Sequence, residues 1–191
     1  MKKLIGKSIS LSCTIRLHQA KYATITGVPP VDEGVLMFYN MGNVKSEDSE
    51  NSIYNKKDAD KYVRFIGNYP LQLSVALPLF SWMAQYRNGK LINLISKTNG
   101  IDSVNKSKIS ETESGKRYKI ISPFLQNGNY FMEGDELKIE KLSEAALTEA
   151  AQLIADNMKE KQCKIIFYDL DEYNLNTYSY ESLEKILAPF N

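Results

Sequence analysis

Residues 34–39 read Gly-Val-Leu-Met-Phe-Tyr, and the polar residue Asn40 follows them directly. A near-continuous apolar run of this length is typical of a parallel strand that is buried on both faces. A second such run, Lys-Ile-Ile-Phe-Tyr-Asp, occupies residues 164–169 near the end of the chain. Strands of this kind, with helical segments between them, predict an α/β fold with a parallel sheet.

Two further strands are predicted on either side of the first run. Residues 8–18 alternate between apolar and polar types, which predicts a strand with Arg16 and His18 on its polar face. Residues 71–82 predict another strand, which ends or bends at Pro78 because proline has no N–H for the hydrogen-bond ladder. The chain therefore offers about four strands for one sheet.

Three helices are predicted between and after these strands. Asn55, Ser143 and Ser179 are N-cap residues, and apolar side chains follow each of them at helical spacing. The first helix is expected to end at Gly67 and the last at Pro189. Parallel strands joined by crossover helices form either an open sheet or, with four strands, half of an eight-stranded barrel.

A long insertion is predicted after the third strand, at residues 85–140. Its residues 96–116 are polar and are expected to be mobile. Asn88-Gly89 predicts a tight hairpin, while residues 118–122 and 136–139 are expected to pair as strands. We therefore expect an α+β insertion with a small β-hairpin region.

Composition favours one globular domain, so residues 1–191 are expected to form a single half-barrel domain. Lys and Arg total 24 against 23 for Asp and Glu, and the scattered cations do not favour a nucleic-acid partner. No segment reaches the roughly 20 apolar residues of a membrane helix. Lys7 interrupts the apolar N-terminal stretch, so no competent signal peptide is predicted, and export of a longer parent protein stays open.

Few residues suit a metal or a cofactor. Cys13 and Cys163 fit no metal-ligand spacing and are expected to act as small buried apolar residues. His18 is the only histidine, which excludes a multi-histidine metal site. No glycine-rich phosphate loop follows any predicted strand. We therefore expect neither a metal nor a cofactor.

Three predicted strand ends resemble those of glycoside hydrolase family 18, the chitinase-like hydrolases. Residues 37–40, Met-Phe-Tyr-Asn, are similar to the Met-x-Tyr-Asp that closes the sixth barrel strand of that family. Residues 76–81 resemble its seventh-strand Gly-x-Pro-x-Tyr-Gly, and residues 165–171 resemble its eighth strand. The resemblance implies the second half of a (β/α)₈ barrel, strands five to eight, from a divergent bacterial relative.

The departures from the family pattern bear on activity. Asn40 stands where the family has Asp, Phe80 lacks the Tyr hydroxyl, and Tyr168 stands where a Trp is usual. The fourth-strand signature Asp-x-x-Asp-x-Asp-x-Glu occurs nowhere in the 191 residues. The resemblance thus implies a chain without the catalytic acid cluster, which a missing or separate N-terminal half would supply.

Barrel sites form where the carboxyl ends of the strands meet, so the candidate site residues are those at the predicted strand ends. The substrate-binding candidates are Arg16, His18, Tyr39, Asn40, Trp82, Tyr168 and Asp171, and the candidate catalytic residue is Asp169. Such a mixture of aromatic, amide, cationic and acidic side chains suits an oligosaccharide or other glycan ligand.

Each candidate also has a purely structural interpretation. Tyr39 can close the core, and Arg16 can form a structural ion pair with Asp169 or Asp171. The two aspartates are expected on one strand, with Cα atoms roughly 6–7 Å apart. Glycoside hydrolysis usually needs carboxyls about 5–9 Å apart on both sides of the bond, whereas these would approach from one side.

Three functions remain open from the sequence. The chain is the C-terminal part of a glycoside-hydrolase-like protein, or a noncatalytic sugar-binding or assembly module, or an unrelated open-sheet protein. Because a half-barrel has two open edges, we expect a homodimer, association with an N-terminal half-barrel, or edges covered by residues 96–140.

Overall fold

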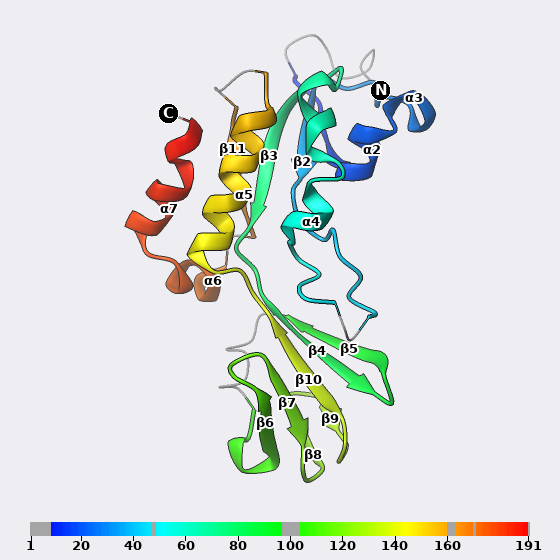
Figure 1. Ribbon diagram of the computed structural model, residues 1–191, viewed down its shortest axis with the longest axis vertical. Coiled ribbons are helices and arrows are strands. Elements are labelled where there is room, and N and C mark those ends of the chain that lie inside the picture. The colour runs from blue at the N-terminus through cyan, green and yellow to red at the C-terminus, as the bar shows by residue number, and fades with distance from the viewer. Residues whose placement is uncertain (1–8, 47–48, 97–103, 160–162, 170, 191) are drawn as a thin grey trace.

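The computed structural model describes residues 9–46, 49–96, 104–159, 163–169 and 171–190. The molecule is elongated, with an α/β unit at one end and an antiparallel β unit at the other (Figure 1). The two units are joined where the chain leaves the third strand of the parallel sheet and where it returns to the long helix α5.

The sheet of the α/β unit has four parallel strands in the order β1-β2-β3-β11. They are β1 (Ser12–Arg16), β2 (Glu33–Met37), β3 (Gln72–Pro78) and β11 (Ile165–Tyr168). The predicted α/β class and the four-stranded parallel sheet are therefore confirmed. Pro78 ends β3, as expected of a residue that cannot donate to the ladder.

The helices of the α/β unit are α2 (Leu17–Lys21), α3 (Ala23–Thr26), α4 (Lys56–Ala59), η1 (Val63–Asn68), α5 (Glu144–Asn157), α6 (Glu172–Thr177), α7 (Tyr180–Leu187) and η4 (Ala188–Phe190). The side chains of Asn55, Ser143 and Ser179 each accept a backbone N–H at a helix start, so the three predicted N-caps are confirmed. The helix expected up to Gly67 is instead divided into α4 and the 3₁₀ helix η1.

The two faces of the sheet differ in burial. Ile15, Leu36 and Val75 occupy one register row and are fully buried in the core that also contains residues of α5. The next row, on the opposite face, consists of Arg16, Met37, Ala76 and Ile166. Arg16 and Ile166 are exposed there and Met37 is half-buried, so helices cover only one face. We call the other the inner face.

The strand predicted over residues 8–18 is shorter than expected, and residue 8 lies outside the described residues. The strand ends at Arg16, and Leu17 begins α2. The Gln19 Oε1 accepts the Arg16 N–H at 2.8 Å, and Leu17 and Ala20 are buried in the core. The expectation that His18 shares a strand face with Arg16 is therefore wrong, since His18 lies on a helix.

The β unit is a five-stranded antiparallel sheet in the order β5-β4-β10-β7-β6. Its elements are β4 (Trp82–Arg87), β5 (Lys90–Ser96), η3 (Lys106–Lys108), β6 (Ile109–Glu113), β7 (Arg117–Ile120) and β10 (Glu136–Glu140), with the separate pair β8 (Phe124–Gln126) and β9 (Asn129–Phe131). The insertion begins at Trp82, three residues earlier than predicted. A small core of its own includes Met83, Ile120 and Leu137.

The predicted turns and pairings of the insertion have mixed outcomes. The hairpin at Asn88-Gly89 is confirmed, and both residues have the positive φ that a tight hairpin turn requires. The pairing of β7 with β10 is also confirmed. Residues 96–116 were expected to be polar and mobile, but they contain η3 and β6, which pairs with β7; residues 97–103 lie outside the described residues.

Candidate functional site

Aromatic rings from three strands meet at the carboxyl edge of the parallel sheet. Tyr39 and Tyr168 are stacked, with ring centroids 5.3 Å apart. Phe80 lies edge-on to both, at 5.6 Å from Tyr39 and 5.9 Å from Tyr168. Trp82 extends this group at 5.2 Å from Phe80. We refer to these four residues as the aromatic cluster.

Strand periodicity explains why these rings converge. Tyr39 follows Met37 by two residues, and Tyr168 follows Ile166 by two, so both continue the inner face. Because the carboxyl ends of parallel strands meet at one edge, side chains two residues beyond each strand row become neighbours. Asn40 then adopts a positive φ of 55°, which asparagine tolerates, as the chain leaves the strand.

The two tyrosines of the cluster differ in exposure. Tyr39 is 8% exposed, whereas Tyr168 is 47% exposed and presents its ring to solvent. Burial raises the pKa of Tyr39, and the nearby Tyr168 and Asp169 raise it further, so the hydroxyl stays protonated. Tyr168 is thus the accessible ring, and Tyr39 supports it from below.

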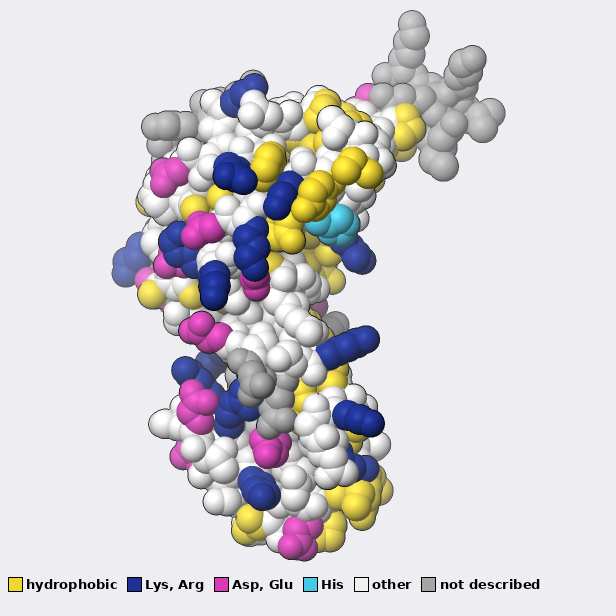
Figure 2. Space-filling view, turned by 45° about the vertical axis from the view of Figure 1, so that its right-hand side comes forward, with side chains coloured by type: hydrophobic (Ala, Val, Ile, Leu, Met, Phe, Trp, Pro, Cys, Tyr) yellow, Lys and Arg dark blue, Asp and Glu magenta, His cyan; other side chains and the backbone are white. Residues whose placement is uncertain are grey.

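A hollow of about 330 Å³ opens beside the cluster and contains four of the predicted site residues. It is lined by Arg16, Leu17, His18, Met37, Tyr39, Asn40, Met41 and Tyr62. The chain's single histidine lies on the surface among hydrophobic and cationic side chains in Figure 2. This hollow has the size of the smaller ligand pockets, and both polar and apolar side chains form its wall.

Trp82 is held by a buried polar network. Its Nε1 donates to Glu140 Oε2 at 2.8 Å, and the Ser52 N–H donates to the same oxygen at 3.0 Å. Lys138 Nζ lies 2.6 Å from Glu140 Oε1, and both side chains are almost completely buried. Burial alone would raise the pKa of Glu140, but hydrogen bonds from Lys138, Ser52 and Trp82 hold it below its usual value. Glu140 is therefore a carboxylate fixed in an ion pair.

The aspartates at the end of β11 have separate roles. β11 ends at Tyr168, the Tyr168–Asp169 peptide bond is cis, and Asp171 caps α6 by accepting the Tyr173 N–H at 2.9 Å. Asp169 Oδ1 instead accepts from Asn174 Nδ2 at 2.6 Å. The expectation that both aspartates stand on one strand is therefore wrong, because the strand ends at Tyr168, before either aspartate.

The predicted ion pair between Arg16 and one of these aspartates is also not formed. Arg16 ends β1 and Asp169 follows β11, and these strands are the two opposite edges of the sheet. The pattern of residues along the chain did not indicate this order of the strands in the sheet.

Among the residues that the structure describes, no group of three or more His, Cys, Asp or Glu side chains is placed to bind a metal. Cys13 and Cys163 are half-buried and not joined by a disulfide.

Sequence reasoning missed several residues near the site. Met41 and Tyr62 line the hollow, and Glu140, which is ion-paired with Lys138, accepts the Trp82 Nε1–H from the neighbouring strand of the β unit. The alternation of Lys138 and Glu140 in a strand is ordinarily a sign of a solvated face. The loop that carries Ser49 and Ser52 forms hydrogen bonds with both side chains, and Trp82 forms one with Glu140.

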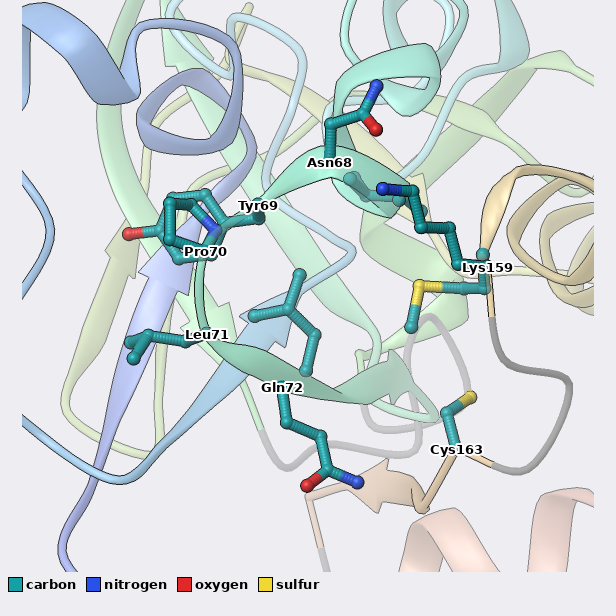
Figure 3. Close-up of a pocket in the computed structure, with 11 residues that line it drawn as sticks. Asn68, Tyr69, Pro70, Leu71, Gln72, Lys159 and Cys163 are labelled. Atoms are coloured by element: carbon teal, nitrogen blue, oxygen red, sulfur yellow. The ribbon is translucent and has the colours of Figure 1, made fainter.

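A second hollow, of about 480 Å³, lies at the opposite end of the sheet, where β3 and β11 begin. Figure 3 shows the chain curving around it from Asn68 to Gln72, with Lys159 and Cys163 on the far side. Burial raises the pKa of the Cys163 thiol, which disfavours a nucleophilic thiolate. Because (β/α) folds place function at the carboxyl ends of strands, we assign no role to this hollow.

Comparisons with known proteins find similarity in structure alone. No family model and no curated protein matches the sequence. A chitinase from Chromobacterium violaceum is similar over 95% of this chain and 56% of its own, with a TM-score of 0.54 and 9% identity. The spore cortex-lytic enzyme SleL of Bacillus cereus is similar over 97% of this chain and 42% of its own, with a TM-score of 0.49 and 12% identity.

A glycoside hydrolase family 18 N-acetylglucosaminidase from Paenibacillus barengoltzii covers 94% of this chain, with a TM-score of 0.42 and 11% identity. The chain spans about half the length of these proteins. The likeness to the chitinase shows a shared α/β fold. In the described part of the chain, no helix has the length and apolar character needed to cross a membrane.

Proposed function

We propose that this chain forms the C-terminal four β/α units of a glycoside-hydrolase-like barrel and contributes glycan-contacting side chains at the barrel mouth. The shared fold supports the first part of this proposal, because the chain corresponds to just over half of a chitinase. The four parallel strands, with helices on one face, are what half of such a barrel requires.

The meeting of Tyr39, Phe80 and Tyr168 at one strand edge carries the second part. An exposed aromatic face stacks on the C–H-rich face of a sugar, while adjacent planar polar groups bond its hydroxyls. The half-exposed Tyr168 supplies such a face, and Arg16 and Asn40 of the neighbouring hollow supply donors and acceptors.

The same geometry favours binding over hydrolysis by this chain's own residues. Most glycoside hydrolases use two carboxyls that flank the bond. Of the acidic residues near the cluster, Asp171 caps α6 and Glu140 is ion-paired with Lys138. Asp169 remains as one candidate acid, and a second carboxylate would have to come from an N-terminal half-barrel or another partner chain.

A titration with β-1,4-linked N-acetylglucosamine oligomers tests the binding role. Trp82 is the only tryptophan and lies in the cluster, so its fluorescence reports occupancy. We expect Tyr168→Ala to weaken binding roughly tenfold or more, which corresponds to about 1.4 kcal/mol of lost stacking. Tyr180→Ala removes a more exposed tyrosine ring from α7, away from the cluster, and should leave the affinity unchanged. Equal affinity of Tyr168→Ala and the unaltered chain would refute the proposal.

A reducing-sugar assay on the same oligomers tests the absence of catalysis. We expect that this chain alone binds the oligomers but releases no reducing ends from them. Release that Asp169→Asn abolishes would show that the chain is a self-sufficient hydrolase. Asp169→Asn keeps the oxygen that accepts from Asn174, so the local structure should persist.

A further inference from the structure

Among the elements that the structure describes, the parallel sheet has two unpaired edges and one open face. Within the described residues, β1 pairs only with β2 and β11 only with β3. The inner-face side chains Met37 and Val35 are half-buried, while Ile166 is 40% exposed. Exposed parallel edges carry unsatisfied backbone groups and invite further strands, and an open apolar face favours a covering partner.

The carboxyl ends of the two edge strands carry opposite charges. Arg16 is the last residue of β1, is exposed, and forms no ion pair within the described part of the chain. Asp169 directly follows β11, and its carboxylate accepts a hydrogen bond from the neutral side-chain amide of Asn174. The order of the sheet keeps the two charges on opposite edges of one chain. A second sheet placed against both edges would bring each charge next to its opposite.

We propose that two copies of this chain close one eight-stranded barrel about a twofold axis parallel to the strands. Rotation about such an axis keeps all strands parallel and places β1 of each copy beside β11 of the other. This inference rests on the half-barrel proposed above and names its partner. Twofold homodimers are the commonest soluble oligomers, and closure removes both open edges at once.

Closure completes the candidate site as well as the sheet. Arg16 of one copy comes to lie at the mouth beside Asp169 and Tyr168 of the other, because β1 and β11 become neighbours. The inner faces with Met37 and Ile166 turn toward each other and fill the barrel interior, as side chains do in eight-stranded barrels. Each cleft then contains residues of both chains.

Sedimentation equilibrium on the full chain gives the first test. We expect a species of twice the chain mass of 21.7 kDa already without added oligosaccharide, and a smaller dissociation constant when oligosaccharide is added, because each cleft contains residues of both chains. A monomer at all concentrations would overturn the proposal and point to a separate N-terminal half-barrel as the partner. Glycan binding by such a monomer would leave the proposed function intact, so the two failures are distinguishable.

Charge reversal gives the second test and identifies the interface. We expect Arg16→Asp and Asp169→Arg each to weaken dimerisation roughly 100-fold, since each places like charges at both edges. An equimolar mixture of the two variants should recover a heterodimer, because both interfaces then pair opposite charges. Arg64→Asp, an exposed substitution on η1, should dimerise normally. Unaltered dimers of both single variants, or a mixture that stays monomeric while circular dichroism shows folded chains, would overturn the proposed interface.

Discussion

The ring of Tyr39 lies parallel to the ring of Tyr168, with planes 5° apart and centroids separated by 5.3 Å. Tyr39 lies two residues beyond the end of β2 and Tyr168 ends β11, and these two strands are not neighbours because β3 lies between them. The stack therefore crosses over the end of β3, where Phe80 packs against both rings. This arrangement fixes the exposed ring of Tyr168 on a rigid base.

Removing the Tyr39 ring should mainly lower the stability of the fold, whereas removing the Tyr168 ring should mainly weaken glycan binding. We expect Tyr39→Ala to lower the free energy of unfolding by about 3–5 kcal/mol, because it opens a cavity beneath the cluster. Tyr168→Ala should cost less than about 1 kcal/mol because the ring is half-exposed, yet it should weaken oligosaccharide binding. Urea unfolding of both variants measures this difference. Equal destabilisation would show that Tyr168 is also a core residue.

Substitutions of Glu140 and Lys138 should have non-additive effects on the free energy of unfolding. We expect Glu140→Gln to destabilise the fold by about 3–5 kcal/mol, because it leaves the buried Lys138 without its counter-ion. The double change of Glu140→Gln with Lys138→Met should cost less than the single change, since no buried charge remains. Glu50→Gln, at an exposed position, serves as the control in the same urea titration. A double variant that loses the sum of both single effects would contradict the coupling.

The same carboxylate predicts a loss of stability in acid. The pKa of Glu140 is lower in the folded chain than its ordinary value of 4.5, so the unfolded chain binds the proton more readily. Its contribution is therefore present above about pH 4.5 and is lost as the pH falls toward the folded value. Melting temperatures between pH 3 and 6 should show this decline. The decline should be shallower in the double variant, which has no carboxyl at position 140.

Asp171 and Asp169 should respond differently to substitution. We expect Asp171→Ala to cost about 0.5–2 kcal/mol, the usual loss for a missing N-cap, without changing glycan affinity. Asp171→Ser keeps a capping oxygen and should recover most of the stability. Thermal unfolding and the fluorescence titration measure the two effects. A large change in affinity would place Asp171 at the sugar, contrary to its capping role.

Tyr178 should make the fold less stable at alkaline pH. Burial raises the pKa of Tyr178 to about 12, and its hydroxyl donates to the Leu142 carbonyl at 2.8 Å. Because the unfolded chain releases this proton near pH 10, stability should fall by up to about 2–3 kcal/mol between pH 10 and 12. Denaturant unfolding over that range measures the slope. Tyr178→Phe should be less stable at pH 8 but should lose less as the pH rises.

Local sequence signals determined much of the secondary structure. The apolar run at residues 34–39 and the N-caps Asn55, Ser143 and Ser179 depend only on residues nearby in the chain. Pro78 and Asn88-Gly89 act through their own backbone preferences, so their effects were also predictable. The convergence of the strand ends followed from the parallel order, which the repeated strand–helix alternation indicated.

Only the tertiary structure decided the order of the strands in the parallel sheet and the burial of polar side chains in the β unit. The sequence allows an ion pair of Arg16 with Asp169 or Asp171, but the strand order β1-β2-β3-β11 places Arg16 and Asp169 on opposite edges, and strand order depends on long-range pairing. Lys138 and Glu140 have the alternation of a solvated strand, yet both are buried, and the distant residues Ser49 and Ser52 form hydrogen bonds with them. Periodicity reports which faces of an element are apolar, whereas the identity of the neighbour on each face is set by the packing of the whole chain.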